Sequence, residues 1–151
     1  MEKRLFSRVC IPVLLLLWAP LTIQATIYNE NGSSSSYNLL NGDVLYINSG
    51  TYQGDIETFE KGALIRVMSG ATFQPRKINF PHGKIINYGT ILFDFPGASP
   101  SVRFEPTEGF ELDNFGKVRI VDETFTHSTE TWQNRFGATI HFEAKTELNP
   151  G

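Results

Sequence analysis

Cysteine is almost absent from this chain of 151 residues. The single cysteine, Cys10, lies within an apolar N-terminal run that we expect to be removed. The remaining chain then forms no disulfide bond and no thiolate metal site, and it has no thiol for catalysis. Its stability outside a cell must come from side-chain packing and backbone pairing.

Helical periodicity and excess positive charge are also lacking. After position 25 no stretch repeats apolar residues at i, i+3, i+4 and i+7, so we expect essentially no helix. This excludes a phosphate-cradling loop before a helix, and no Gly-x-Ser-x-Gly nucleophile elbow occurs.

The net charge is −3. Without the segment 1–25, Lys plus Arg falls from 13 to 10 and Asp plus Glu from 16 to 15, which leaves a net charge of −5. These scattered charges argue against a nucleic-acid partner.

The segment 1–25 has the organisation of a secretory signal peptide. Lys3, Arg4 and Arg8 precede an apolar run from Val9 to Trp18, and a small residue, Ala25, provides a cleavage point. The run is too short for the ~20 residues that span a bilayer, although an uncleaved membrane anchor is the alternative. We expect export through the Sec pathway, cleavage near Ala25, a secreted or cell-surface location and no stable membrane insertion afterwards.

Two series of glycines repeat in step through the rest of the chain. Stretches such as 46–52, 85–91 and 112–118 read apolar, any, Asn, any, Gly, polar, apolar. The glycines of this motif are evenly spaced apart from one longer step: Gly50, Gly70, Gly89, Gly116 and Gly137. The second series precedes the first and shares its longer step: Gly42, Gly62, Gly83 and Gly109. A repeat of about 20 residues indicates a solenoid, with glycines at its corners.

Alternation at period two between the glycines predicts strands with one buried face. In residues 90–95, for example, Ile91, Phe93 and Phe95 fall on one face and Thr90, Leu92 and Asp94 on the other. We therefore predict an all-β fold, a single-stranded parallel β-helix with coils of about 20 residues. A β-sandwich would explain the strands and turns but not two glycine series in register. The chain divides into a signal peptide (1–25), a Ser- and Asn-rich segment with a first strand (26–41), and about five coils (42–151).

Equivalent residues of successive coils should stack into ladders. We expect an interior apolar ladder of Tyr52, Phe73, Ile91, Val118 and Ile140. An asparagine ladder of Asn48, Asn87 and Asn114 should occupy a turn, where side-chain amides bond up and down the stack. A turn-rich insertion at 96–100 accounts for the longer gap between Gly89 and Gly116.

The motifs at 47–54, 70–75 and 86–91 resemble the N-terminal β-helical region of large secreted surface proteins of gliding-type Gram-negative bacteria that use type IX secretion. The resemblance covers roughly the stretch 40–145. It implies adhesion, surface display or a matrix contribution, with repeated modules and a C-terminal sorting domain further along. The sequence in hand contains no such domain, so we expect an incomplete stack that continues into further modules or needs a capping partner.

Residues for catalysis are scattered. Polysaccharide lyases and hydrolases built on β-helices need acids clustered on one outer face. The acidic candidates stand singly or as one adjacent pair: Glu105, Glu108, Glu111, Asp113, Asp122 and Glu123. The histidines also stand apart: His82, His127 and His141. We interpret these residues as solvated strand faces and turns, and expect no enzyme activity, metal or cofactor.

Aromatic residues offer the one candidate binding surface. The candidates for stacking on sugar rings are Tyr88, Phe115 and Trp132. The aromatic residues just before the corner glycines could fill a corner of the core instead, and these are Tyr88, Phe115 and Phe136. A threonine column at 51, 72, 90 and 139, interrupted by Lys117, reads as a turn ladder rather than as an ice-binding array. We predict a non-enzymatic structural or adhesive module whose partners are surface glycans or matrix proteins. The alternatives are a carbohydrate-binding β-helix and a fragment of a polysaccharide lyase or hydrolase.

Overall fold

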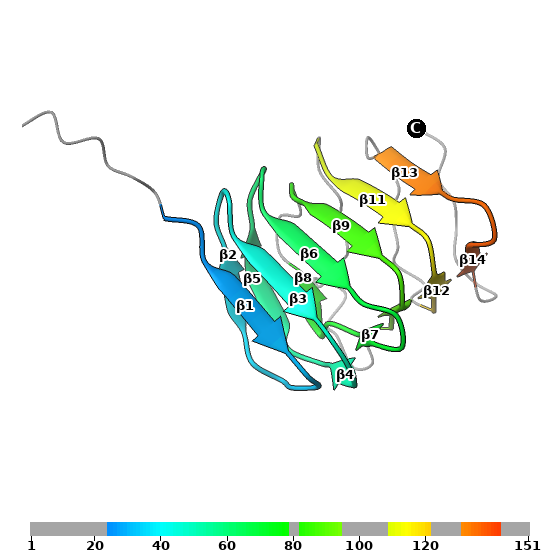
Figure 1. The fold of residues 1–151 in the computed structure, drawn as a ribbon, viewed down its shortest axis with the longest axis horizontal. Coiled ribbons are helices and arrows are strands. Elements are labelled where there is room, and N and C mark those ends of the chain that lie inside the picture. Colours follow the sequence, from blue (N-terminus) through cyan, green and yellow to red (C-terminus); the bar gives the residue numbers. More distant parts are fainter. Residues whose placement is uncertain (1–23, 79–81, 95–108, 122–130, 143–151) are drawn as a thin grey trace, which may run out of the picture.

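The computed structural model describes residues 24–78, 82–94, 109–121 and 131–142. Within these residues every regular element is a β-strand, and the strands pair in parallel between successive coils (Figure 1). Val44 pairs with Leu64 and Leu64 pairs with Lys84, which gives the coil of about 20 residues that the glycine repeat predicts. The fold is therefore the predicted parallel β-helix. The sandwich alternative is excluded because its strands pair antiparallel.

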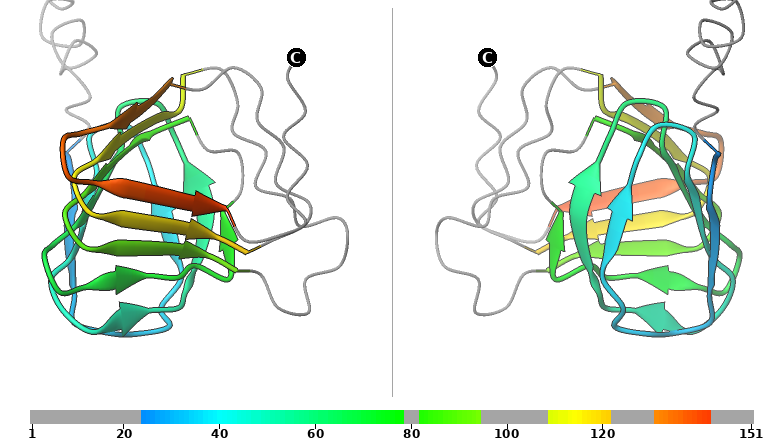
Figure 2. Two further views of the ribbon diagram at one scale, coloured as in Figure 1. Left: turned by 90° about the vertical axis from the view of Figure 1, so that its right-hand side faces the viewer. Right: turned by 90° about the vertical axis from the view of Figure 1, so that its left-hand side faces the viewer.

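The strands form three parallel sheets. The six-stranded sheet contains, in spatial order, β1 (Ile27–Glu30), β3 (Val44–Ile47), β6 (Leu64–Val67), β9 (Lys84–Asn87), β11 (Glu111–Asn114) and β13 (Thr131–Asn134). The five-stranded sheet contains β4 (Thr51–Tyr52), β7 (Thr72–Phe73), β10 (Thr90–Phe93), β12 (Lys117–Ile120) and β14 (Thr139–Phe142). The three-stranded sheet contains β2 (Tyr37–Leu39), β5 (Asp55–Phe59) and β8 (Lys77–Ile78). Figure 2, which looks along the long axis, shows these strands around a common interior.

The stack begins one coil before the glycine repeat does. Strands β1 and β2 lie in the segment 26–41, and they pair with β3 and β5 of the next coil. The predicted insertion at 96–100 lies outside the described residues. Backbone hydrogen bonds join successive coils and stabilise the stack, in which no internal disulfide bond can form.

Inward-facing side chains of all three sheets form one apolar core. The predicted interior ladder is confirmed: register pairing runs from Tyr52 to Phe73, Ile91, Val118 and Ile140. The first four are fully buried, and Ile140 is half-buried against the core. A second column, in the six-stranded sheet, buries Leu45, Ile65, Ile85 and Leu112. Strand alternation thus produces the interior that the sequence predicted.

The asparagine ladder differs from its prediction by one member. Asn87 and Asn114 pair in register and are fully buried, and Asn114 pairs with Asn134. Asn48 does not belong to this ladder, because Ile47 is the residue that aligns with Val67 and hence with Asn87. The reason is corner length: three residues join β3 to β4, whereas two join β9 to β10. Alignment on the glycines therefore shifts the strands by one residue.

The asparagines stabilise the short corners through both ends of their amides. Asn114 Nδ2 donates to Asn134 Oδ1 at 2.7 Å and to the carbonyl of Thr139 at 3.1 Å. Its Oδ1 accepts from Asn87 Nδ2 at 2.7 Å and from the amide of Gly116 at 3.2 Å. Asn87 Oδ1 accepts from the amide of Gly89 in the same way, at 3.0 Å. These bonds satisfy amides that would otherwise be buried unpaired at a high cost.

The first coil carries polar side chains into the interior. Glu30 is buried and accepts a hydrogen bond from the hydroxyl of Tyr37. Burial, followed by the neighbouring Glu30, raises the pKa of Tyr37 to about 12. Tyr52 donates to the carbonyl of Ser35 at 2.7 Å, and burial raises the pKa of its hydroxyl. These two tyrosines therefore close this part of the core with both hydroxyls hydrogen-bonded.

Candidate functional site

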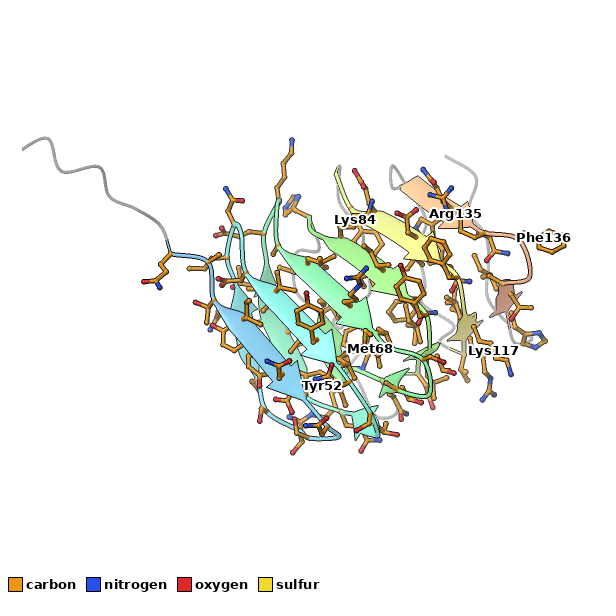
Figure 3. All side chains as sticks on the ribbon, in the orientation of Figure 1. Tyr52, Met68, Lys84, Lys117, Arg135 and Phe136 are labelled. Carbon is orange, nitrogen blue, oxygen red and sulfur yellow. The ribbon has the colours of Figure 1, made fainter. Side chains whose placement is uncertain are left out.

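A row of exposed side chains follows the carboxyl ends of the strands in the six-stranded sheet. The residue after each strand donates its amide to the carbonyl of the last residue of the strand before it, at 2.8–2.9 Å. This pattern places five residues of successive coils in one row: Asn48, Met68, Tyr88, Phe115 and Arg135. We call the last four, which are exposed, the corner column. Figure 3 labels Met68 and Arg135, which are its two ends.

Strand alternation turns the corner column outward. In each of these coils the preceding residue belongs to the inward row, and Val67, Asn87 and Asn114 are buried there. The next residue along an extended chain points to the opposite side. Tyr88 is 39% exposed and Phe115 is 42% exposed, so neither fills the core corner that the alternative interpretation proposed.

The two rings of the column stack on each other between two arginines. The ring centroids of Tyr88 and Phe115 lie 4.9 Å apart with 16° between the ring planes. Arg66 Cζ lies 5.5 Å from the centroid of Tyr88, and Arg135 Cζ lies 5.6 Å from the centroid of Phe115. Both contacts fall within the range of cation–π attraction. The result is a continuous row of guanidinium, ring, ring and guanidinium.

Arg66 is held on the outer face of the sheet by tyrosines. A hydrogen bond with Tyr88 raises the pKa of Arg66, and a second hydrogen bond with Tyr46 acts in the same direction. Tyr46 pairs with Arg66 in the strand register, which explains their contact. No described residue accepts a hydrogen bond from the buried Nε of Arg66. The raised pKa means that this guanidinium stays charged beside the aromatic pair.

Ion pairs between β9 and β11 lie beside the corner column. Lys84 Nζ lies 2.8 Å from Asp113 Oδ2 and 3.1 Å from Glu111 Oε2. Arg135 lies 3.0 Å from Asp113 Oδ1, so Asp113 bridges two cations from neighbouring coils. The hydrogen bond from Lys84 lowers the pKa of the Asp113 carboxyl, and Arg135 adds to this. Hydrogen bonds to Asp113 and then Glu111 raise the pKa of Lys84.

Replacing Asp113 by asparagine should destabilise the protein by about 1 kcal/mol at neutral pH, since one partly buried carboxylate serves two cations. Because the folded state lowers the pKa of this carboxyl, its contribution is present above the unfolded value of about 3.9 and is lost as pH falls through the folded value. Urea unfolding at pH 7 and pH 2.5 measures the loss of stability and its dependence on pH.

The matched control is Asp55→Asn, which removes one exposed ion pair with Arg76 and should cost less. If the free energies of unfolding of Asp113→Asn and of the unchanged protein differ as much at pH 2.5 as at pH 7, the electrostatic explanation is wrong.

Two of the three predicted contact residues meet at this site. Tyr88 and Phe115 form the stacked pair, whereas Trp132 lies in an inward row beside Leu112 and packs near Phe110, with ring centroids 6.5 Å apart. Arg66, Met68 and Arg135 were not predicted. Phe136, which precedes a corner glycine as Phe115 does, is fully exposed in a longer corner instead of standing in the column.

Among the residues that the structure describes, the remaining candidates do not form a second site. The threonine column is confirmed in register, with Lys117 between Thr90 and Thr139. His82 and His141 lie apart, and Glu105, Glu108, Asp122, Glu123 and His127 fall outside the described residues. Across 24–78, 82–94, 109–121 and 131–142, no three of His, Cys, Asp and Glu gather as a metal site would require. The same ranges contain no helix long and apolar enough to cross a membrane.

Comparison with known proteins adds no relative. No protein-family model, no curated protein and no solved structure matches this chain.

Proposed function

We propose that this protein is a secreted, non-enzymatic adhesive module, a rigid β-solenoid whose outer six-stranded face contacts glycans of a cell surface or matrix. The observation that carries the proposal is the exposed Tyr88–Phe115 pair between Arg66 and Arg135. Large aromatic residues exposed together, with arginines beside them, have the composition of binding surfaces rather than of inert ones.

The surroundings of the pair support a contact surface broader than two rings. Val44, Leu64 and Ile86 also face outward from this sheet and are half-buried, and Met68 is exposed at the end of the column. These side chains belong to consecutive coils, so one extended surface runs along the stack. A surface on paired strands is held more rigidly than one on loops, and rigidity lowers the entropic cost of binding.

Ion pairing of the acids supports a function without catalysis. Asp113 and Glu111, two described acids beside the column, form ion pairs with Lys84, and the pKa of Asp113 is lowered. A general acid or base near neutral pH needs a pKa close to that pH, which a carboxylate held between two cations does not have. The secretory character of the segment 1–25 supports an extracellular setting.

Binding of the purified protein to immobilised polysaccharides tests the proposal. Replacing Tyr88 and Phe115 together by alanine should weaken binding at least tenfold, since both rings lose the apolar area that they bury against the ligand, at about 25 cal/mol per Å². Both side chains are on the surface, so circular dichroism should show an intact fold.

Leu40→Ala is the matched control, because Leu40 is an exposed apolar residue, 47% accessible, away from the column. It should bind as the unchanged protein does. Equal binding by the double variant would exclude the column as the contact site, and no binding to any polysaccharide would overturn the proposed function.

A further inference from the structure

The faces of the two rings in the corner column are already occupied. Tyr88 and Phe115 cover each other, Arg66 lies over Tyr88 from the preceding coil, and Arg135 lies over Phe115 from the following coil. A neutral sugar that stacks on an aromatic ring needs an open ring face. The column instead presents ring edges to the solvent, and the edge of an aromatic ring carries the positive part of its quadrupole.

The outer face around the column is also positively charged. Its described outward side chains include three cations, Arg66, Lys84 and Arg135, and two carboxylates, Glu111 and Asp113. This local excess of one positive charge occurs in a chain whose net charge is −3. Both carboxylates are engaged with Lys84, whereas Arg66 contacts tyrosine hydroxyls and no described carboxylate. Positive ring edges and an arginine without an acidic partner among the described residues both favour an anion.

We propose that the corner column binds an acidic polysaccharide, a linear chain of pyranoses that carry carboxylates, laid along the stack. This proposal rests on the proposed function and names its ligand class. Arg66 holds one carboxylate, because a guanidinium fork matches the two oxygens of that group. Arg135, which also pairs with Asp113, holds a second carboxylate with its remaining donors. The two rings between them, and Met68 at the level of Arg66, pack against the apolar edges of the sugar units.

The spacing of the arginines calls for a polymer rather than a single sugar. Arg66 belongs to the coil of β6 and Arg135 to that of β13, three coils further along the sheet. Three coils at ~4.8 Å each separate the two levels by roughly 14 Å. A ligand that reaches both guanidinium groups must therefore contain several consecutive sugar units.

Alginate and its propylene glycol ester provide the test, because esterification removes the carboxylate charges and keeps the pyranose chain. The protein should bind alginate about tenfold more tightly than the ester, and added NaCl should weaken only the alginate binding. Arg135→Gln should reduce alginate affinity about tenfold and leave binding to the ester unchanged. The matched control is Arg76→Gln, since Arg76 is an exposed arginine paired with Asp55 on the three-stranded sheet; alginate binding should be unchanged in this variant.

The outcomes separate the two proposals. Equal binding to alginate and ester, without salt dependence, would overturn the acidic ligand and leave the glycan-binding function standing. Binding to neither polymer nor to any other polysaccharide would overturn both. A concentration-dependent dimer in sedimentation that disappears on replacing Tyr88 and Phe115 would assign the face to a second copy of the chain and overturn the acidic ligand. The comparison of the two polymers needs no variant, so a folding defect in Arg135→Gln would not remove the test.

Discussion

Replacing Gly116 by alanine should prevent stable folding of the solenoid. A Cβ atom at this position would lie 2.1 Å from the carbonyl oxygen of Gly89 and 2.9 Å from the carbonyl carbon of Tyr88. Both are backbone atoms of the preceding coil, and that corner is tied by the bond from the amide of Gly89 to Asn87. The corner cannot move without breaking the stack, so we expect a loss of roughly 3 kcal/mol or more. Urea unfolding followed by circular dichroism measures it.

Gly70→Ala is the matched control for this prediction. Gly70 occupies the equivalent corner of an earlier coil, and its φ is +83°. Apart from its chain neighbours, no described heavy atom lies within 4 Å of the position that an alanine Cβ would take there. Alanine at this corner would meet no steric clash, and its only cost is the left-handed backbone conformation, about 1–2 kcal/mol. If Gly70→Ala destabilises the protein as much as Gly116→Ala, close packing between the short corners is not what requires the glycine at 116.

The glycine spacing was sufficient to predict the architecture. Glycines recur at about every 20 residues because each coil turns at the same places, and period-two alternation marks the strands between them. The ladder through Tyr52, Phe73 and Ile91 follows from these two patterns alone, because each of these side chains stands close behind a glycine of the first series. These features are local in the sequence, so they needed no knowledge of three-dimensional contacts.

Corner length could not be read from the same pattern. The corner contains two residues after β9 and β11, three after β3, and four after β6 and β13. Gly89 is therefore the second residue after its strand, whereas Gly50 is the third. An alignment of the repeats on their glycines matches the corners but shifts the strands that precede them. For this reason it places Asn48 in the asparagine ladder and leaves Asn134 out.

Only the part of the candidate site that lies in corners of equal length could be predicted from the sequence. Tyr88 and Phe115 each stand between a ladder asparagine and a glycine in a two-residue corner, so the motif aligns them correctly. Arg135 belongs to a four-residue corner, where the same alignment selects Phe136. Arg66 reaches Tyr88 diagonally from the preceding coil, a contact that depends on side-chain length and not on the repeat.

Replacing Asn114 by aspartate should destabilise the protein by about 3 kcal/mol or more at neutral pH, whereas Asn48→Asp should have little effect. Asn114 is fully buried, and its Nδ2 donates to Asn134 Oδ1 and to the carbonyl of Thr139. A carboxylate of the same shape has no hydrogen to donate and faces both oxygens, so two buried acceptors lose their partner. Asn48 is partly exposed and has a single side-chain bond, at 3.2 Å to Asn29.

The pH dependence of Asn114→Asp distinguishes a buried charge from a simple loss of shape. Burial disfavours the ionised form, so the introduced carboxyl should have a pKa raised above its unfolded value of about 3.9. An acid whose pKa is higher in the folded state destabilises the protein above that pKa, and this penalty fades as pH falls toward the unfolded value. Protonation also restores one donor to the ladder. Chemical unfolding at pH 7 and pH 4.5 should therefore show a smaller deficit at the lower pH. A deficit that is constant with pH, or one shared by Asn48→Asp, would mean that the ladder through Asn87, Asn114 and Asn134 does not hold these corners together.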